Sequence, residues 1–154
     1  MAQREILTIP QWENFLRQTA RPVENFDNRL RQLLDDMAET LYKRDGVGLA
    51  APQVGVRRRV VVIDAGDGLM ELINPEITFK DGEQIGDEGC LSIPGVQKRV
   101  LRPMSVTVKA KDRQGRDVEF SGMGLKARAF CHEIDHLNGI LFIDRIQEGQ
   151  EEQE

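Results

Sequence analysis

The chain has 154 residues, of which 40% are hydrophobic and 31% charged, so it has the size and composition of one soluble globular domain. Its formal net charge is −5 and its Lys and Arg residues are scattered, which argues against direct binding to nucleic acid. No apolar run is long enough to cross a bilayer, and MAQREILTIP lacks the apolar stretch of a signal peptide, so we expect a cytoplasmic protein without membrane contact.

The chain begins with a segment of mixed pattern. Pro10 and Pro22 predict an irregular arm with one short helix near residues 12–17. Apolar residues then recur at spacings of three and four, which predicts an amphipathic helix with its apolar stripe in the core. Asp27 is placed to cap the start of this helix, and Gly46 to end it. The stripe consists of Leu30, Leu33, Leu34, Met37 and Leu41.

Strands are expected in the middle of the chain. Short β-branched runs lie at Val60–Ile63, Leu72–Asn74, Ile77–Lys80, Val106–Lys111 and Val118–Phe120. Turn signals such as Asp81-Gly82 and Gln114-Gly115 indicate antiparallel pairing. Helical periodicity returns between Gly122 and Asn138 and stops at Gly139. This order predicts an α+β domain, in which antiparallel strands pack around the late helix.

The two ends of the chain differ in composition. A single domain is expected over residues 1–146. Residues 147–154 are mostly Gln and Glu, which predicts an acidic, solvated and disordered tail.

Both histidines of the chain, His132 and His136, fall in the sequence HEIDH of the late helix. A spacing of four puts the two imidazoles on one helical face, and Glu133 lies at the edge of that face. Two surface histidines can share a helix by chance. A buried carboxylate, however, needs a metal, a proton or a donor nearby, so the pattern favours a metal site with Glu133 as its reactive acid.

A catalytic metal site usually has three protein ligands. Asp144, in what looks like another strand, is one candidate for the third. Cys90 is the better candidate, because EGCLS reads as a turn leading into 93–95, where the thiolate is accessible. A lone cysteine is more often a small buried hydrophobe. We give that interpretation to Cys131, which points away from the imidazoles. Two cysteines are also too few for a disulfide framework.

A Gly- and Ala-rich stretch, GVGLAAPQ at residues 46–53, lets another chain approach its backbone closely. It lacks the Lys and Ser or Thr of a phosphate-binding loop. Together, GVGLAAPQ, EGCLS and HEIDH resemble, in order and spacing, the three motifs of the peptide deformylase family. INPEI and HLNGILF agree as well, so the resemblance covers about residues 5–146.

The resemblance implies a metal-dependent hydrolase that removes the formyl group from the N-terminal formyl-methionine of nascent polypeptides and releases formate. It implies Cys90, His132 and His136 as the ligands of one divalent metal ion. Fe²⁺ is the implied physiological metal, and Zn²⁺ or Ni²⁺ can replace it in a purified sample. Glu133 is implied as the general acid and base.

The resemblance also implies how the substrate is held. Gln53 and the backbone N–H of Leu91 would bind the oxyanion, and Gly48 and Gly89 would pair with an extended substrate backbone. The pocket for the methionine side chain would be lined by Val47, Leu125 and Ala129.

Two features depart from the family pattern. The N-terminal arm keeps only parts of it, which leaves the arm's conformation open. The chain also stops in EGQEEQE soon after Arg145, where some bacterial members continue into a basic helix that docks on the ribosome. An acidic end should be repelled by RNA, so docking by that route is not expected. Asp135 has two interpretations, as a residue that orients a ligand histidine or as an ordinary charge.

Two other functions remain open. HExxH also marks zinc endopeptidases, but their third ligand is usually His or Glu, so Cys90 weighs against them. Alternatively, the metal of a non-catalytic binding module would only fasten a loop to a helix. Such a closed site normally has four protein ligands, so a fourth ligand would favour this reading.

Overall fold

The computed structural model describes residues 2–146, and the expected acidic tail at 147–154 lies outside the described residues. The elements are, in chain order, α1 (Glu13–Leu16), α2 (Asn28–Lys43), β1 (Gly48–Ala50), η1 (Ala51–Val54), β2 (Val60–Ile63), β3 (Met70–Asp81), β4 (Gln84–Cys90), β5 (Ile93–Arg102), β6 (Ser105–Lys111), β7 (Asp117–Met123), α3 (Leu125–Leu137) and η2 (Phe142–Arg145).

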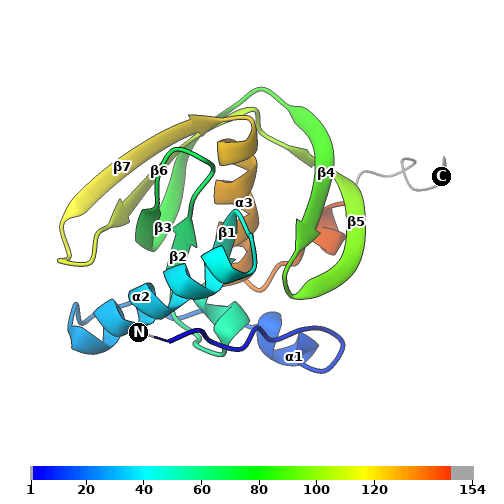
Figure 1. The fold of residues 1–154 in the computed structure, drawn as a ribbon. Helices are drawn as coiled ribbons and strands as arrows, with labels where there is room; N and C mark the ends of the chain where they lie inside the picture. The colour runs from blue at the N-terminus through cyan, green and yellow to red at the C-terminus, as the bar shows by residue number, and fades with distance from the viewer. Residues whose placement is uncertain (1, 147–154) are drawn as a thin grey trace.

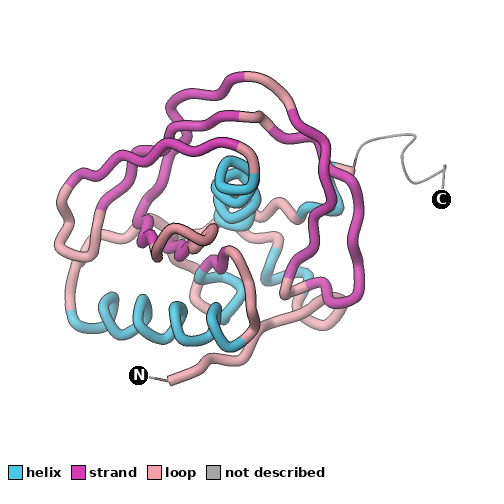
Figure 2. Tube along the Cα trace, turned by 45° about the horizontal axis from the view of Figure 1, so that its top comes forward, coloured by secondary structure: helices cyan, strands magenta, loops and turns pink. Residues whose placement is uncertain are grey.

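The strands of residues 2–146 form two antiparallel sheets. One sheet has five strands in the order β1-β2-β3-β6-β7, and the other is the hairpin of β4 and β5. Helix α3 lies between the two sheets (Figures 1 and 2). The predicted α+β class, with antiparallel strands around the late helix, is therefore confirmed.

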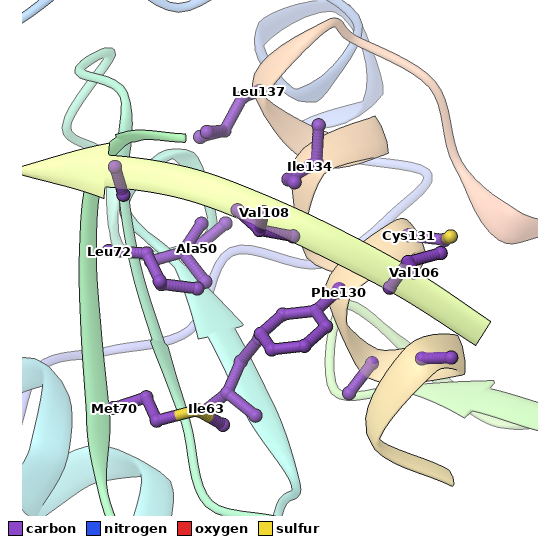
Figure 3. Close-up of a cluster of buried hydrophobic side chains, with 14 of the residues drawn as sticks. Ala50, Ile63, Met70, Leu72, Val106, Val108, Phe130, Cys131, Ile134 and Leu137 are labelled. Carbon is purple, nitrogen blue, oxygen red and sulfur yellow. The ribbon is translucent and has the colours of Figure 1, made fainter. Parts of the chain in front are cut away.

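The five-stranded sheet is covered on both faces at β2, where all four residues are buried. Successive side chains of a strand point to opposite faces, so Val60 and Val62 of β2 pack in the cluster that contains α2. Val61 and Ile63 pack in the cluster that contains α3. Figure 3 shows this second cluster, in which Phe130, Ile134 and Leu137 point from α3 toward the sheet. These apolar contacts with the sheet fix the position of α3.

The predicted helices of the first half are confirmed, with one correction. The short helix α1 lies where it was expected, and Asp27 caps α2 by accepting a hydrogen bond from the Leu30 N–H at 3.1 Å. Gly46, however, does not end α2. The helix stops at Lys43, and the left-handed residue after it is Asp45, with φ of 55°.

The predicted strands need two corrections. The runs at 72–74 and 77–80 belong to one strand, β3, whose pairing with β6 shifts register after Ile73. Asn74 interrupts the pattern with φ of 53°, because its side chain exchanges two hydrogen bonds with the backbone of Val23. The expected turn around Cys90 is instead the hairpin of β4 and β5, with Cys90 as the last residue of β4.

The C-terminal part also differs from expectation. Gly122 still belongs to β7, and α3 begins at Leu125. Asp144 lies in the 3-10 helix η2 rather than in a strand, and it pairs with Arg17 at 2.8 Å.

Among residues 2–146, no helix has the length and apolar character needed to span a membrane.

Candidate active site and metal centre

A cavity of about 740 Å³ opens between β1, the β4–β5 hairpin and α3. Nearly all the residues proposed from the sequence line it, namely Val47, Gly48, Gln53, Gly89, Cys90, Leu91, Leu125, Ala129, His132 and Glu133. His136 is the exception, because it is only 1% exposed. It contacts Cys90, which does line the cavity. The fold therefore brings together segments that are up to 86 positions apart, as the difference between Val47 and Glu133 shows.

The three predicted metal ligands form one cluster. A ligand atom from each of Cys90, His132 and His136 lies within 4.8 Å of those of the other two. The Cys90 Sγ and the His136 Nε2 are 3.3 Å apart. Among the described residues, no fourth Cys, His, Asp or Glu joins the group. A soft thiolate and two imidazoles suit Fe²⁺ or Zn²⁺, and three ligands leave room for a water molecule.

Glu88, a residue of the EGCLS motif for which no role was predicted, holds one of these histidines. Its Oε1 lies 2.8 Å from the His132 Nδ1, so the ring's other nitrogen faces the cluster. The same carboxylate accepts two hydrogen bonds from Arg102, at 2.7 and 2.9 Å, and one from Arg128 at 2.7 Å. A carboxylate behind a ligand histidine fixes the ring's orientation and tautomer, which is a common feature of metal sites.

The charges around Glu88 keep it ionised. Burial by itself would raise the pKa of Glu88, but the hydrogen bonds from Arg102 and His132 hold it well below its usual range. Burial would likewise lower the pKa of His132, yet the nearby Glu133, Cys90 and Glu88 outweigh it and raise that pKa. For His136, burial and the nearby charges of His132 and Arg102 outweigh the opposing effect of Glu88 and lower the pKa, so the ring is neutral and available as a ligand.

Glu133 lies beside the cluster, with its Oε2 3.9 Å from the His132 Nε2. Its side chain is buried, and its Oε1 finds no hydrogen-bond partner among residues 2–146. Burial raises its pKa to about 7, although His132 acts in the opposite direction. A cation bound by the neighbouring ligands would lower that pKa.

Gly48 explains how the carboxyl of Glu133 fits against β1. A Cβ on Gly48 would come within 2.7 Å of both Cγ and Oε2 of Glu133, so any side chain at this position would displace the carboxyl. The family resemblance implied only a role toward the substrate for Gly48. Because Gly48 has no side chain, it also leaves the space that the Glu133 carboxyl occupies.

Gln53 is fixed in the cavity by its own amide oxygen, which accepts a hydrogen bond from the Ala50 N–H at 2.9 Å. This orientation directs its Nε2 toward the Ser92 Oγ at 3.1 Å and the Cys90 Sγ at 3.5 Å. Gln53 is 1% exposed, so its N–H donors lie beside the cluster and away from solvent. Ser92 was not singled out in the sequence, where a serine in a turn carries no distinctive signal.

The remaining sequence-based interpretations divide into two groups. Cys131 packs in the hydrophobic cluster between α3 and the sheet, as expected (Figure 3). Asp135 does not orient a histidine. It accepts hydrogen bonds from Arg102 at 2.8 Å and from Arg145 at 2.7 Å, so it supports the cluster only through Arg102.

Comparison with known proteins gives a consistent result. A family model described as Polypeptide deformylase matches residues 3–152. The peptide deformylase of Thermoanaerobacter pseudethanolicus is 56% identical over 142 residues, which cover 92% of this chain and 89% of that protein.

Solved structures agree with the sequence comparison. The crystal structure of peptide deformylase from Thermotoga maritima has a TM-score of 0.91 at 42% identity, covering 96% of this chain and 99% of that one. A Met-Ala-Ser-bound class I type b peptide deformylase from Acinetobacter baumannii has a TM-score of 0.88 at 37% identity, covering 94% of this chain and 98% of that one.

Proposed function

The chain belongs to the polypeptide deformylase family, and from this premise we propose that it is a metal-dependent hydrolase that removes the formyl group of N-terminal formyl-methionine and releases formate. The observation that carries the proposal is the cluster of Cys90, His132 and His136 at the wall of the cavity, beside the buried carboxyl of Glu133, whose Oε1 has no hydrogen-bond partner among the described residues. The nascent chains that carry formyl-methionine are made in the cytoplasm, where we expect the enzyme to act. Its expected lack of nucleic-acid and membrane binding stays a prediction.

The residues present fit a divalent metal ion. Cys90, His132 and His136 would hold it, since their donor atoms already converge and Glu88 already orients one ring. When bound, such an ion would lower the pKa of a water molecule toward about 7 and polarise the formyl oxygen.

Glu133 is the residue proposed to move protons. Its carboxylate would take a proton from the attacking water and later deliver it to the amine that leaves as the formyl C–N bond breaks. Burial raises the pKa of Glu133 and a bound cation would lower it, and a carboxyl group under these two opposing effects is suited both to accept and to donate a proton. The products are formate and a peptide with a free amino terminus.

Gln53 and the Leu91 N–H are proposed to stabilise the negative charge that develops on the formyl oxygen. Donors held in place before the reaction contribute most, because they need not reorient as the charge forms. The Ala50 N–H holds the Gln53 amide in this way.

The substrate is proposed to lie along the free edge of β4. Gly48 and Gly89 line the cavity from β1 and β4, so an extended peptide could pair with their backbones. Its methionine side chain would enter among Val47, Leu125 and Ala129. The Met-Ala-Ser complex of the Acinetobacter baumannii relative supports a peptide ligand.

Replacing Gln53 with Ala is expected to lower kcat by about 10² to 10³, the usual effect of losing one oxyanion donor. Ser92→Ala is the matched control, because it removes the neighbouring hydroxyl but leaves the Gln53 amide held by Ala50. Steady-state formate release measures both variants. A change confined to KM would instead make Gln53 a substrate-binding residue.

The ferrous form is expected to be far more active than the zinc form and to lose activity in air. Iron can leave the ferrous state, and the Cys90 thiolate can be oxidised, whereas zinc has no redox chemistry of its own. The test loads apo-protein separately with Fe²⁺, Ni²⁺ and Zn²⁺ and follows formate release before and after exposure to air. Equal and air-stable activity of the iron and zinc forms would show that Fe²⁺ is the wrong metal.

A product analysis tests the proposed reaction against the endopeptidase alternative. The protein is incubated with formyl-Met-Ala-Ser and with a longer unformylated peptide, and the products are identified by mass spectrometry. We expect loss of the formyl group from the first and no cleavage of the second. Cleavage of an internal peptide bond without deformylation would contradict the proposal.

A further inference from the structure

Arg128 is a buried cation in the wall of the candidate active-site cavity, and the reaction proposed above gives it no role. It lies on α3 one position before Ala129, is 6% exposed and lines the same cavity as Leu125 and Ala129. The interior of a protein is a costly place for an unpaired charge. Its partners therefore indicate what it does.

Those partners connect Arg128 to the cluster of proposed metal ligands through Glu88. The Arg128 Nη1 donates to the Glu88 Oε2 at 2.7 Å and to the Val100 carbonyl at 3.1 Å. The other oxygen of Glu88 lies 2.8 Å from the His132 Nδ1. One carboxylate thus separates the cavity wall from a proposed metal ligand.

The backbone of β4 leaves room for this arrangement. A Cβ on Gly86 would lie 3.0 Å from the Arg128 Nη2 and 3.4 Å from its Cζ, so the guanidinium lies close against the strand at this glycine. The guanidinium thus packs against β4 on one side and faces the cavity on the other.

Arg102 also binds Glu88, but it differs from Arg128 in two respects. Both its Nε and Nη2 donate to Glu88 while its Nη1 donates to Asp135, so its guanidinium is held at both ends. It does not line the candidate active-site cavity. Of the two arginines, only Arg128 can be touched by a side chain bound there.

We propose that Arg128 is a positioning residue that links the methionine-side-chain pocket to His132 through Glu88. A side chain that fills the pocket beside Leu125 and Ala129 restricts the guanidinium of Arg128, which keeps Glu88 against the His132 ring. Filling the pocket then raises kcat as well as affinity. This inference rests on the proposed function, because it assumes that the methionine side chain enters this pocket.

The test uses the full chain and three variants on one helix. Arg128→Met keeps the length of the side chain but removes the charge and the donors, whereas Arg128→Lys keeps the charge. Lys126→Met is the matched control, because it removes one positive charge from α3 at a residue that pairs with Asp67 on the surface. Circular dichroism establishes that each variant is folded.

Two measurements are made on each protein. Competition with a chelator gives the affinity for Co²⁺, whose visible absorption also reports the geometry of its ligands. Formate release from formyl-Met-Ala-Ser and formyl-Ala-Ala-Ser gives the ratio of kcat between a side chain that fills the pocket and one that does not.

For Arg128→Met we expect Co²⁺ affinity to fall by about 10- to 100-fold, the scale for losing a group that supports a ligand. The Met-to-Ala ratio of kcat should fall toward one, because the coupling between pocket and ligand is lost. Arg128→Lys should recover part of both quantities, since it keeps the charge without the planar donor arrangement. Lys126→Met should match the wild type in both.

Two results would overturn the inference. One is an Arg128→Met variant with the Co²⁺ affinity of Lys126→Met. The other is a weakened site with an unchanged Met-to-Ala ratio, which would make Arg128 a structural ion-pair partner only. If Arg128→Met does not fold, Arg128→Lys decides by the same two criteria. A wild-type protein without deformylase activity would contradict the proposed function instead, and the Co²⁺ affinity would still report whether Arg128 supports the ligand site.

Discussion

Glu133→Ala is expected to bind its metal like the wild type and to release formate about 10² to 10⁴ times more slowly, the range for losing a general acid and base. The ligand atoms belong to Cys90, His132 and His136, so the substitution leaves all three in place. What it removes is a buried carboxyl group whose Oε1 has no partner among the described residues and whose pKa burial raises to about 7. Among residues 2–146, no other carboxyl group that lines the cavity combines those properties.

Metal content and kcat must be measured on the same preparation of Glu133→Ala. Glu119→Ala provides the control, because it removes an exposed carboxylate from β7 that lies outside the cavity. Turnover by Glu133→Ala within a few-fold of the wild type, with metal retained, would rule out Glu133 as the proton-transfer group.

Cys90→Ala is expected to lose most of its bound metal and, with it, nearly all activity. Removing the thiolate leaves only two imidazoles, whereas catalytic sites of this kind have three protein ligands. The chain offers a matched control in Cys131→Ala, which removes the other thiol. Cys131 packs against the sheet and is absent from the ligand cluster, so its loss should affect stability modestly and metal content very little.

Metal analysis after dialysis of the two cysteine variants separates these cases, and thermal unfolding shows whether each remains folded. A Cys90→Ala protein that holds a full equivalent of metal would mean that the thiolate is not a ligand. The cluster would then need a different third donor.

The late helix could be predicted from the sequence because apolar residues and histidines each recur with helical spacing, on different faces. Phe130, Ile134 and Leu137 repeat with helical spacing and pack toward the sheet (Figure 3), while His132 and His136 repeat with the same spacing on another face. The five-stranded sheet was predictable in part, since β2 is a continuous β-branched run and β6 contains three β-branched residues in succession.

The β4–β5 hairpin could not be predicted in the same way. Its sequence QIGDEGC places a buried carboxylate, Glu88, where an ordinary strand has an apolar residue, and Pro94 and Gly95 at the start of β5 resemble a turn. The buried partner of Glu88, Arg102, lies 14 positions away, and nothing local indicates that the two meet.

Glu88 itself had one usable signal. Residues two apart on a strand face the same side, so a strand that ends at Cys90 puts the Glu88 carboxylate on the thiolate's side. The Pro and Gly residues that follow Cys90 make the segment resemble a turn, which hides this two-residue period in the sequence. The interpretation of Asp135 as a histidine partner was wrong. Glu88, which belongs to β4, contacts His132 instead, and Asp135 binds Arg102.

The most direct measurement is formate release from formyl-Met-Ala-Ser by protein purified without exposure to air, with metal analysis of the same sample. We predict catalytic formate release that rises in proportion to bound metal, disappears when a chelator removes the metal and returns when Fe²⁺ is restored. Full metal occupancy at the Cys90, His132 and His136 cluster without any formate release would contradict the assignment of this cavity as a deformylase active site.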